Sequence, residues 1–90
     1  MYNIIVASAK SFDNYGFLQS KLDYICKDIP DAITIVSTSR LAERYARDRA
    51  LDIVRYTETP ADMLVTFGES HMIEWATKAG LRVIQVEVNK

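Results

Sequence analysis

The 90-residue chain has little of what several classes of protein and site require. Its single cysteine, Cys26, excludes a disulfide within the chain and fits a reducing compartment. Its single histidine, His71, excludes a histidine-rich metal site. No apolar run approaches the roughly 20 residues of a membrane-spanning helix, and no basic segment precedes the first apolar stretch. We therefore expect a cytoplasmic protein without a signal peptide or a membrane partner.

Net charge is also small. Eleven Lys and Arg residues against 12 Asp and Glu residues give a formal net charge of −1 at pH 7. This balance provides no long-range attraction to nucleic acid or to an anionic membrane, and it argues against both as partners. Apolar residues make up 49% of the chain and charged residues 26%, which is typical of one globular domain covering residues 1–90.

Short β-branched and apolar runs alternate with segments of helical spacing. The expected strands cover residues 3–7, 33–36, 53–56, 63–67 and 82–88. Helices are expected before Pro30, from Leu41 to Ala46, and from Met72 to a C-terminal cap at Gly80. Such alternation predicts an α/β fold with parallel strands joined by right-handed crossovers. Only residues 57–62 separate the third and fourth strands, too few for a crossover helix.

Several motifs follow one another along the chain. Residues 8–12 (SAKSF) and Tyr15 follow the first expected strand, and residues 41–46 (LAERYA) lie in the second expected helix. Gly68 and Glu69 then precede residues 73–76 (IEWA). In this order the motifs resemble those of the YspA-like branch of the SLOG superfamily, a Rossmann-like group that includes DprA proteins and the LOG phosphoribohydrolases. The resemblance spans nearly the whole chain, apart from residues 57–62.

The chain departs from this family at two functional positions. The glycine-rich end of the family's second strand has shrunk to residues 37–40 (STSR), which cannot form as tight an amide cradle for a phosphate. If Gly68 corresponds to the glycine of the family's Gly-Thr motif, the position of the LOG catalytic glutamate falls on Met72, and Glu74 lies two residues too late. The resemblance therefore implies binding without catalysis, and we expect no cofactor and no metal site.

Ligands of doubly wound sheets bind at the carboxyl ends of the strands. The expected ligand-binding residues follow the first, second and fourth strands: Ser8, Lys10, Phe12, Ser37, Thr38, Ser39, Arg40, Gly68, Ser70 and His71. The serines and the threonine of residues 37–39 can also cap the following helix. Arg40 and Lys10 are the candidates for contact with an anion. Arg40, Arg44 and Arg47 share one side of the helix, which is either an anion-binding face or a solvated face with local ion pairs.

Rossmann-like relatives suggest the strand order 3-2-1-4-5. The resulting fold is a minimal three-layer Rossmann-like domain with five mostly parallel strands, three helices and one crossover helix missing. The first two helices then cover one face of the sheet and the third covers part of the other. One apolar row of residues 3–7 and 33–36 is expected to stay open to water, and this predicts a homodimer or higher homo-oligomer.

Three functions follow from these observations. The first is non-catalytic binding of a nucleotide-like small molecule; the family's links suggest a bacterial or phage-encoded protein related to defence. The second is an oligomeric protein-interaction scaffold without a small ligand. The third is an N-glycosidic-bond hydrolase of the LOG type, which the lost motifs disfavour. Trp75 either covers the edge of the core or faces a partner.

Overall fold

Strands and helices alternate along the chain, except between the third and fourth strands, as the sequence predicts. A computed structural model describes residues 2–9, 11–55 and 61–88. Their elements are β1 (Tyr2–Ser8), α1 (Tyr15–Cys26), β2 (Ile33–Ser37), α2 (Arg40–Asp48), β3 (Asp52–Arg55), β4 (Met63–Phe67), α3 (Met72–Lys78) and β5 (Arg82–Val86). No helix in these residues has the length and hydropathy that a membrane crossing needs.

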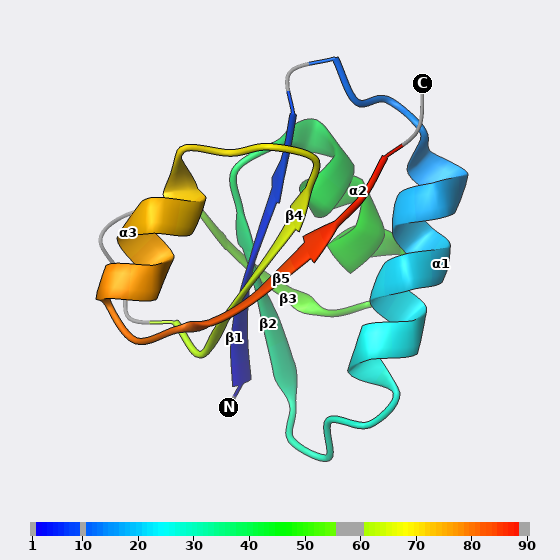
Figure 1. Cartoon of the computed structure of the whole chain (residues 1–90). Helices are drawn as coiled ribbons and strands as arrows, with labels where there is room; N and C mark the ends of the chain where they lie inside the picture. Colours follow the sequence, from blue (N-terminus) through cyan, green and yellow to red (C-terminus); the bar gives the residue numbers. More distant parts are fainter. Residues whose placement is uncertain (1, 10, 56–60, 89–90) are drawn as a thin grey trace.

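The five strands form one sheet in the order β3-β2-β1-β4-β5, and every neighbouring pair is parallel. This confirms the predicted strand order and the minimal Rossmann-like class. Three helices are present in the described residues, and α1 and α2 lie on one side of the sheet with α3 on the other (Figure 1). The link between β3 and β4, which is expected to be too short for a crossover helix, falls mostly on residues 56–60, outside the described residues.

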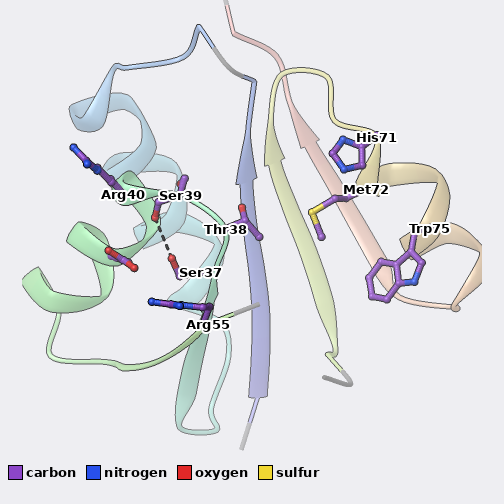
Figure 2. Close-up of a pocket in the computed structure, with 9 residues that line it drawn as sticks. Ser37, Thr38, Ser39, Arg40, Arg55, His71, Met72 and Trp75 are labelled. Atoms are coloured by element: carbon purple, nitrogen blue, oxygen red, sulfur yellow. Dashed lines mark hydrogen bonds between the residues drawn. The ribbon is translucent and has the colours of Figure 1, made fainter. Parts of the chain in front are cut away.

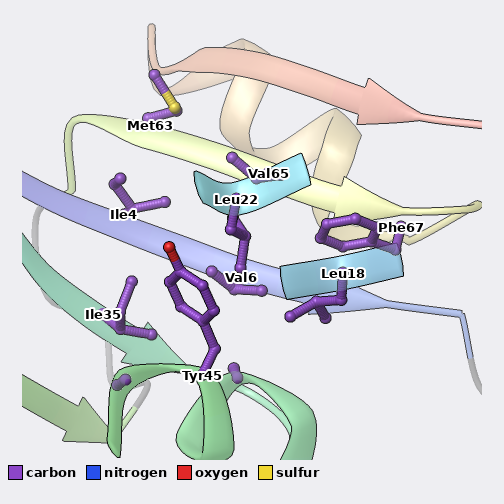
Figure 3. Packing of buried hydrophobic residues seen from close by; sticks show 11 residues of the cluster. Ile4, Val6, Leu18, Leu22, Ile35, Tyr45, Met63, Val65 and Phe67 are labelled. Carbon is purple, nitrogen blue, oxygen red and sulfur yellow. The ribbon is translucent and has the colours of Figure 1, made fainter. Parts of the chain in front are cut away.

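Alternate residues of each strand face opposite layers of the fold. Ile4 and Val6 of β1 pack with α1 and α2, in a cluster that includes Leu18, Leu22 and Tyr45 (Figure 3). The intervening residues of β1 belong to a second, smaller cluster on the side of α3. The period of two in the strand side chains therefore divides the core into two layers.

The expectation of an open apolar row on the α3 side is wrong for the centre of the sheet. Ile5 and Val36 are fully buried there. They belong to the same buried cluster as Met72 and Ala76 of α3, so this row of the sheet is not open to water. The exposed apolar residues of the sheet lie instead in the edge strand β3, where Ile53 and Val54 each keep 40% of their surface exposed.

Helix ends follow local backbone chemistry. α1 ends at Cys26, earlier than the expected end at Pro30, and the N–H of Ile29 donates to the carbonyl of Cys26 at 3.0 Å in a turn. A residue that precedes proline disfavours helical backbone angles, which explains the early end. The predicted cap at Gly80 is confirmed: its φ is +78°, and the N–H of Leu81 donates to the carbonyl of Ala76 at 2.9 Å.

Candidate functional site

An open cleft lies at the carboxyl ends of β2 and β3, between the starts of α2 and α3 (Figure 2). Its volume is about 730 Å³. The residues that line it are Ser37, Thr38, Ser39, Arg40, Glu43, Arg55, His71, Met72 and Trp75. Small-molecule sites in proteins have volumes of about 300–1,000 Å³, so the cleft has the size of a ligand site.

The junction between β2 and α2 forms one wall of the cleft without glycine. The Ser37 hydroxyl donates to the Ser39 carbonyl at 3.0 Å, and the Thr38 hydroxyl donates to the Val6 carbonyl at 2.7 Å. Ser39 is the N-cap of α2, as expected, and its hydroxyl accepts the N–H of Ala42 at 3.3 Å. The hydroxyl groups thus hold the turn in shape.

Three charged side chains lie along this wall. Arg40 and Glu43 come from the first turns of α2, and Arg55 ends β3 beside Ser37 in the strand register. Within the described residues, the ion pairs involve none of these three side chains. The guanidinium groups of Arg40 and Arg55 can bind phosphate or carboxylate oxygens in the geometry that arginine favours.

The opposite wall is apolar and comes from α3. Met72 is buried, whereas Trp75 one turn later keeps 39% of its surface exposed. His71 precedes the helix and makes no side-chain capping hydrogen bond. Figure 2 shows Met72 and Trp75 on the α3 side of the cleft and the arginines on the α2 side. An indole surface in such a position can stack against a planar group of a ligand.

The cleft includes about half of the expected ligand-binding residues. Those that line it are Ser37, Thr38, Ser39, Arg40 and His71. Ser70 and His71 border a second cleft next to it, whose volume is about 460 Å³. Ser8, Phe12 and Gly68 line neither cleft, and Lys10 lies outside the described residues.

Phe12 and Gly68 have structural surroundings that explain their positions. The Phe12 ring stacks on Phe67 with the ring centroids 5.3 Å apart, on the α1 side of the sheet. Gly68 has a φ of +92°, and a Cβ atom there would lie 3.0 Å from the Cβ of Ala9. Glycine at this position therefore allows the turns after β1 and β4 to approach each other closely.

Four residues of the cleft were not among the expected ligand-binding residues: Glu43, Arg55, Met72 and Trp75. Arg55 could have been noticed as a cation at the end of an expected strand. Trp75 follows His71 at a spacing of four residues, which places both on one side of a helix. The side chains of Glu43 and Met72 have no comparable signal in the sequence.

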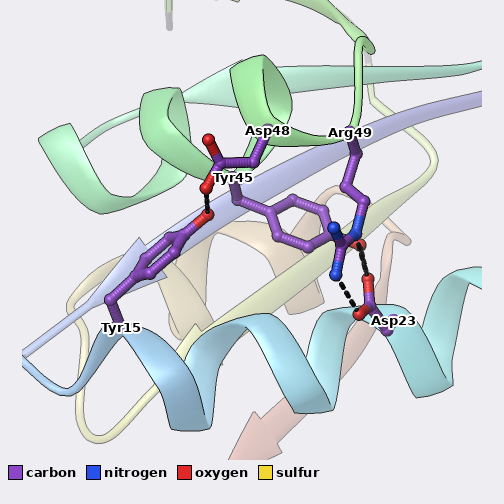
Figure 4. A network of polar contacts seen from close by, with 5 residues as sticks. All are labelled: Tyr15, Asp23, Tyr45, Asp48 and Arg49. Atoms are coloured by element: carbon purple, nitrogen blue, oxygen red, sulfur yellow. Dashed lines mark hydrogen bonds and ion pairs between the residues drawn. The ribbon is translucent and has the colours of Figure 1, made fainter.

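The other arginines of the α2 region mainly join α2 to α1. The Arg49 Nε and Nη2 groups donate to both carboxylate oxygens of Asp23 at 2.9 and 2.6 Å, and Tyr45 Oη donates to the same carboxylate at 2.7 Å (Figure 4). Arg44 lies over the Tyr15 ring, 4.1 Å from its centroid. For Arg44, the structure therefore favours local contacts within the protein over an anion-binding role.

Titration in this network follows from these contacts. The hydrogen bond from Arg49 lowers the pKa of Asp23 below its ordinary value. Burial, assisted by the hydrogen bond to Asp48, raises the pKa of Tyr15 to about 12. Burial also raises the pKa of Tyr45, whose hydroxyl donates to Asp23. These phenols stay protonated at neutral pH and act as hydrogen-bond donors.

Groups for catalysis or for metal binding are few in the cleft. Glu74 is paired with Lys78 at 3.2 Å and does not line the cleft. The described part of the chain has no group of three or more His, Cys, Asp or Glu residues arranged to hold a metal ion.

Comparisons of the chain with protein-family models, with curated proteins and with solved structures find no match. The resemblance to the SLOG superfamily therefore stays a prediction from the sequence motifs.

Proposed function

We propose that this chain is a reduced SLOG-like domain that binds a nucleotide-derived small molecule in the cleft between α2 and α3, without converting it. The observation that carries this proposal is that one cleft of about 730 Å³ has a cationic wall and an aromatic wall facing it. One wall has Arg40 and Arg55, which are in no ion pair among the described residues, and the other has the partly exposed ring of Trp75. A nucleotide carries an anion for the first wall and a planar base for the second.

The expected affinity is modest. Stacking of a base on an aromatic side chain contributes about 1–3 kcal/mol, and a hydrogen bond to a charged group about 1.5–3 kcal/mol. A ligand of about 23 non-hydrogen atoms, such as AMP, binds with about −7 kcal/mol at the efficiency of ordinary ligands, which corresponds to a Kd on the order of 10 µM. A domain of this kind would act by sequestering its ligand, in line with the suggested link to bacterial or phage defence.

The proposal of binding without turnover rests on the small number of carboxylate groups in the described walls of the cleft. The only carboxylate among the described residues of the cleft is Glu43, and it lies on the wall that carries the arginines. The LOG-type hydrolase, which remains the enzymatic alternative, would need a glutamate where the chain has Met72. The test is to incubate the protein with AMP and separate the products by chromatography. Intact AMP supports binding alone, and release of adenine would contradict it.

A thermal-shift titration tests the binding itself. AMP at a hundredfold excess over its Kd should stabilise the folded protein by about 2.7 kcal/mol and raise the melting temperature by about 10 °C or more. Arg40→Ala and Arg55→Ala should each remove most of this shift. Arg47→Ala is the matched control, because Arg47 lies in the same helix and does not line the cleft. Equal shifts in all four proteins would contradict the proposed site.

A second candidate is a scaffold that assembles with copies of itself. It is favoured by the edge strand β3, whose four residues are all exposed, including Ile53 and Val54. An exposed edge strand with apolar side chains can pair with another chain. Light scattering at micromolar concentration should then give the mass of a dimer, and Val54→Lys should return it to a monomer. Tyr24→Lys, on the exposed side of α1, is the control, and a monomeric wild-type chain would rule this candidate out.

A further inference from the structure

Glu43 is the one negatively charged side chain among the described residues that line the cleft between α2 and α3. It is half-buried, and no ion pair in the described part of the chain includes it. The start of α2 is capped by Ser39, whose hydroxyl accepts the N–H of Ala42, so the helix does not use Glu43 for this purpose. The carboxylate of Glu43 is therefore available to a ligand.

The other hydrogen-bonding side chains of this wall are mainly donors. The Ser37 and Thr38 hydroxyls donate to main-chain carbonyls at 3.0 and 2.7 Å, so both of their protons are engaged within the turn. The guanidinium groups of Arg40 and Arg55 have donors only. An ionised carboxylate has two acceptor oxygens and no proton. The wall therefore favours a ligand that presents hydrogen-bond donors to Glu43.

The order of the groups in the cleft matches the order of the parts of a nucleotide. Arg40 and Glu43 are three residues apart in α2, which makes them neighbours on the helix surface. Trp75 lies on the opposite wall (Figure 2). Because the ribose joins the phosphate to the base, a phosphate on Arg40 and a base on Trp75 bring the ribose close to Glu43. The adjacent 2′- and 3′-hydroxyl groups of ribose are donors that match the two oxygens of a carboxylate.

We propose that Glu43 selects ribonucleotides over 2′-deoxyribonucleotides by accepting hydrogen bonds from the ribose hydroxyl groups. This inference rests on the proposed function, because it requires a nucleotide in the cleft. The negative charge of Glu43 weakens the attraction of the wall for a phosphate, and the hydrogen bonds from the ribose offset this loss. A nucleotide without the 2′-hydroxyl leaves the carboxylate with fewer donors, so it should bind more weakly.

Calorimetric titration of the full chain with AMP, 2′-deoxy-AMP and IMP tests this inference. AMP and 2′-deoxy-AMP have the same charge and the same base, so the ratio of their affinities reports on the 2′-hydroxyl alone. AMP should bind about 10-fold more tightly than 2′-deoxy-AMP. IMP has a carbonyl where AMP has an amino group, and it should bind about as tightly as AMP, because Glu43 contacts the sugar and not the base.

Substitution of Glu43 assigns the preference to this side chain. Glu43→Ala should bring the ratio of the affinities for AMP and 2′-deoxy-AMP close to 1. The loss of a negative charge changes the attraction for both phosphates equally, so this effect cancels in the ratio. Glu74→Ala is the matched control, because it removes a carboxylate from the first turn of α3 outside the cleft. The control should keep the ratio of the wild-type chain.

Equal affinities of the wild-type chain for AMP and 2′-deoxy-AMP would overturn the role of Glu43 and leave the proposed function standing. A preference for AMP that persists in Glu43→Ala would also overturn it, as would the loss of binding of both nucleotides in this variant. Binding of IMP that is 10-fold weaker than that of AMP would show that the base is recognised instead, and would contradict the inference. Failure of all three nucleotides to bind the wild-type chain would overturn the proposed function as well.

Discussion

The hydroxyl of Tyr45 in α2 donates a 2.7 Å hydrogen bond to Asp23 in α1, and Arg49 holds the same carboxylate with two further hydrogen bonds. The Tyr45 side chain is almost completely buried, so its hydroxyl depends on this partner. The contact fixes α2 against α1. Because the start of α2 forms one wall of the cleft, the same contact also helps to position Arg40 and Glu43.

Substitution of Asp23 should make stability depend on pH in a defined way. Arg49 lowers the pKa of Asp23 in the folded state, so the ionised carboxylate stabilises the fold above its unfolded pKa of about 4. This stabilisation is lost as the pH falls through the lower folded pKa. Asp23→Asn should therefore melt a few degrees below the wild-type chain at pH 7, and the difference should shrink toward pH 2.

Thermal denaturation followed by circular dichroism from pH 7 to pH 2 measures this difference. Asp28→Asn is the control, because Asp28 is an exposed aspartate just beyond α1 and should change the melting temperature little at any pH. A difference between wild type and Asp23→Asn that stays constant over the whole range would show that the charge of Asp23 does not stabilise the fold.

The residues that follow α2 and α3 both have a left-handed backbone, and exchange of alanine and glycine at these two positions should have opposite effects on stability. Ala50 follows α2 with a φ of +54°, and Gly80 follows α3 with a φ of +78°. Alanine in the left-handed region costs about 1–2 kcal/mol, partly offset by the greater freedom of glycine in the unfolded chain. Ala50→Gly should stabilise the protein by about 1 kcal/mol and Gly80→Ala should destabilise it by a similar amount.

Chemical denaturation and thermal melts of both variants check this pair. A change of about 1 kcal/mol corresponds to roughly 4–8 °C in a domain of this size. No atom lies within 4 Å of the position of a Cβ at Gly80, so the effect of Gly80→Ala should come from the backbone alone. Changes of the same sign in the two variants would contradict this explanation.

Much of the fold can be predicted from the sequence because the relevant information is local. Strand runs, helical spacing and the short segment 57–62 fix the number and order of the elements, and the handedness of crossovers limits the topologies. The coverage of the α3 side could not be predicted. It depends on sheet twist and on the three-dimensional packing that brings Ile5, Val36, Met72 and Ala76 into one cluster, and the hydrophobic pattern shows neither.

Two buried threonines in the sheet should respond oppositely to the same substitution. Thr34 Oγ1 is buried and has no hydrogen-bond partner in the described part of the chain, whereas Thr66 Oγ1 donates to the carbonyl of Gly68 at 3.1 Å. Valine has the same shape and removes the hydroxyl. Thr34→Val should stabilise the protein by about 1 kcal/mol, because an unsatisfied polar group no longer has to be buried. Thr66→Val should destabilise it by a similar amount.

Urea denaturation of the two variants under identical conditions provides the comparison. The two positions differ in whether the hydroxyl has a partner, and both are nearly inaccessible to water. Destabilisation by Thr34→Val equal to that of Thr66→Val would mean that the Thr34 hydroxyl has a partner in solution.

The candidate site could be predicted only in part from the sequence. Residues 37–40 and His71 line the cleft because a strand end and a helix start mark the carboxyl edge of a parallel sheet. Arg55 is visible in the sequence as a cation near the end of an expected strand, but only the strand register places it beside Ser37. From its spacing alone, Trp75 either covers the edge of the core or faces a partner. Only the three-dimensional structure shows that it lies across the cleft from α2.

The intrinsic fluorescence of Trp75 gives the most direct measurement of ligand binding in the cleft. Trp75 is the only tryptophan in the chain and lies on the cleft wall, so its emission reports on that site alone. Addition of AMP should change the emission in a saturable way with a Kd on the order of 10 µM. Arg55→Ala should weaken this binding about 10-fold or more. Emission of the wild-type chain that stays constant up to millimolar AMP, together with an unchanged melting temperature, would contradict nucleotide binding in this cleft.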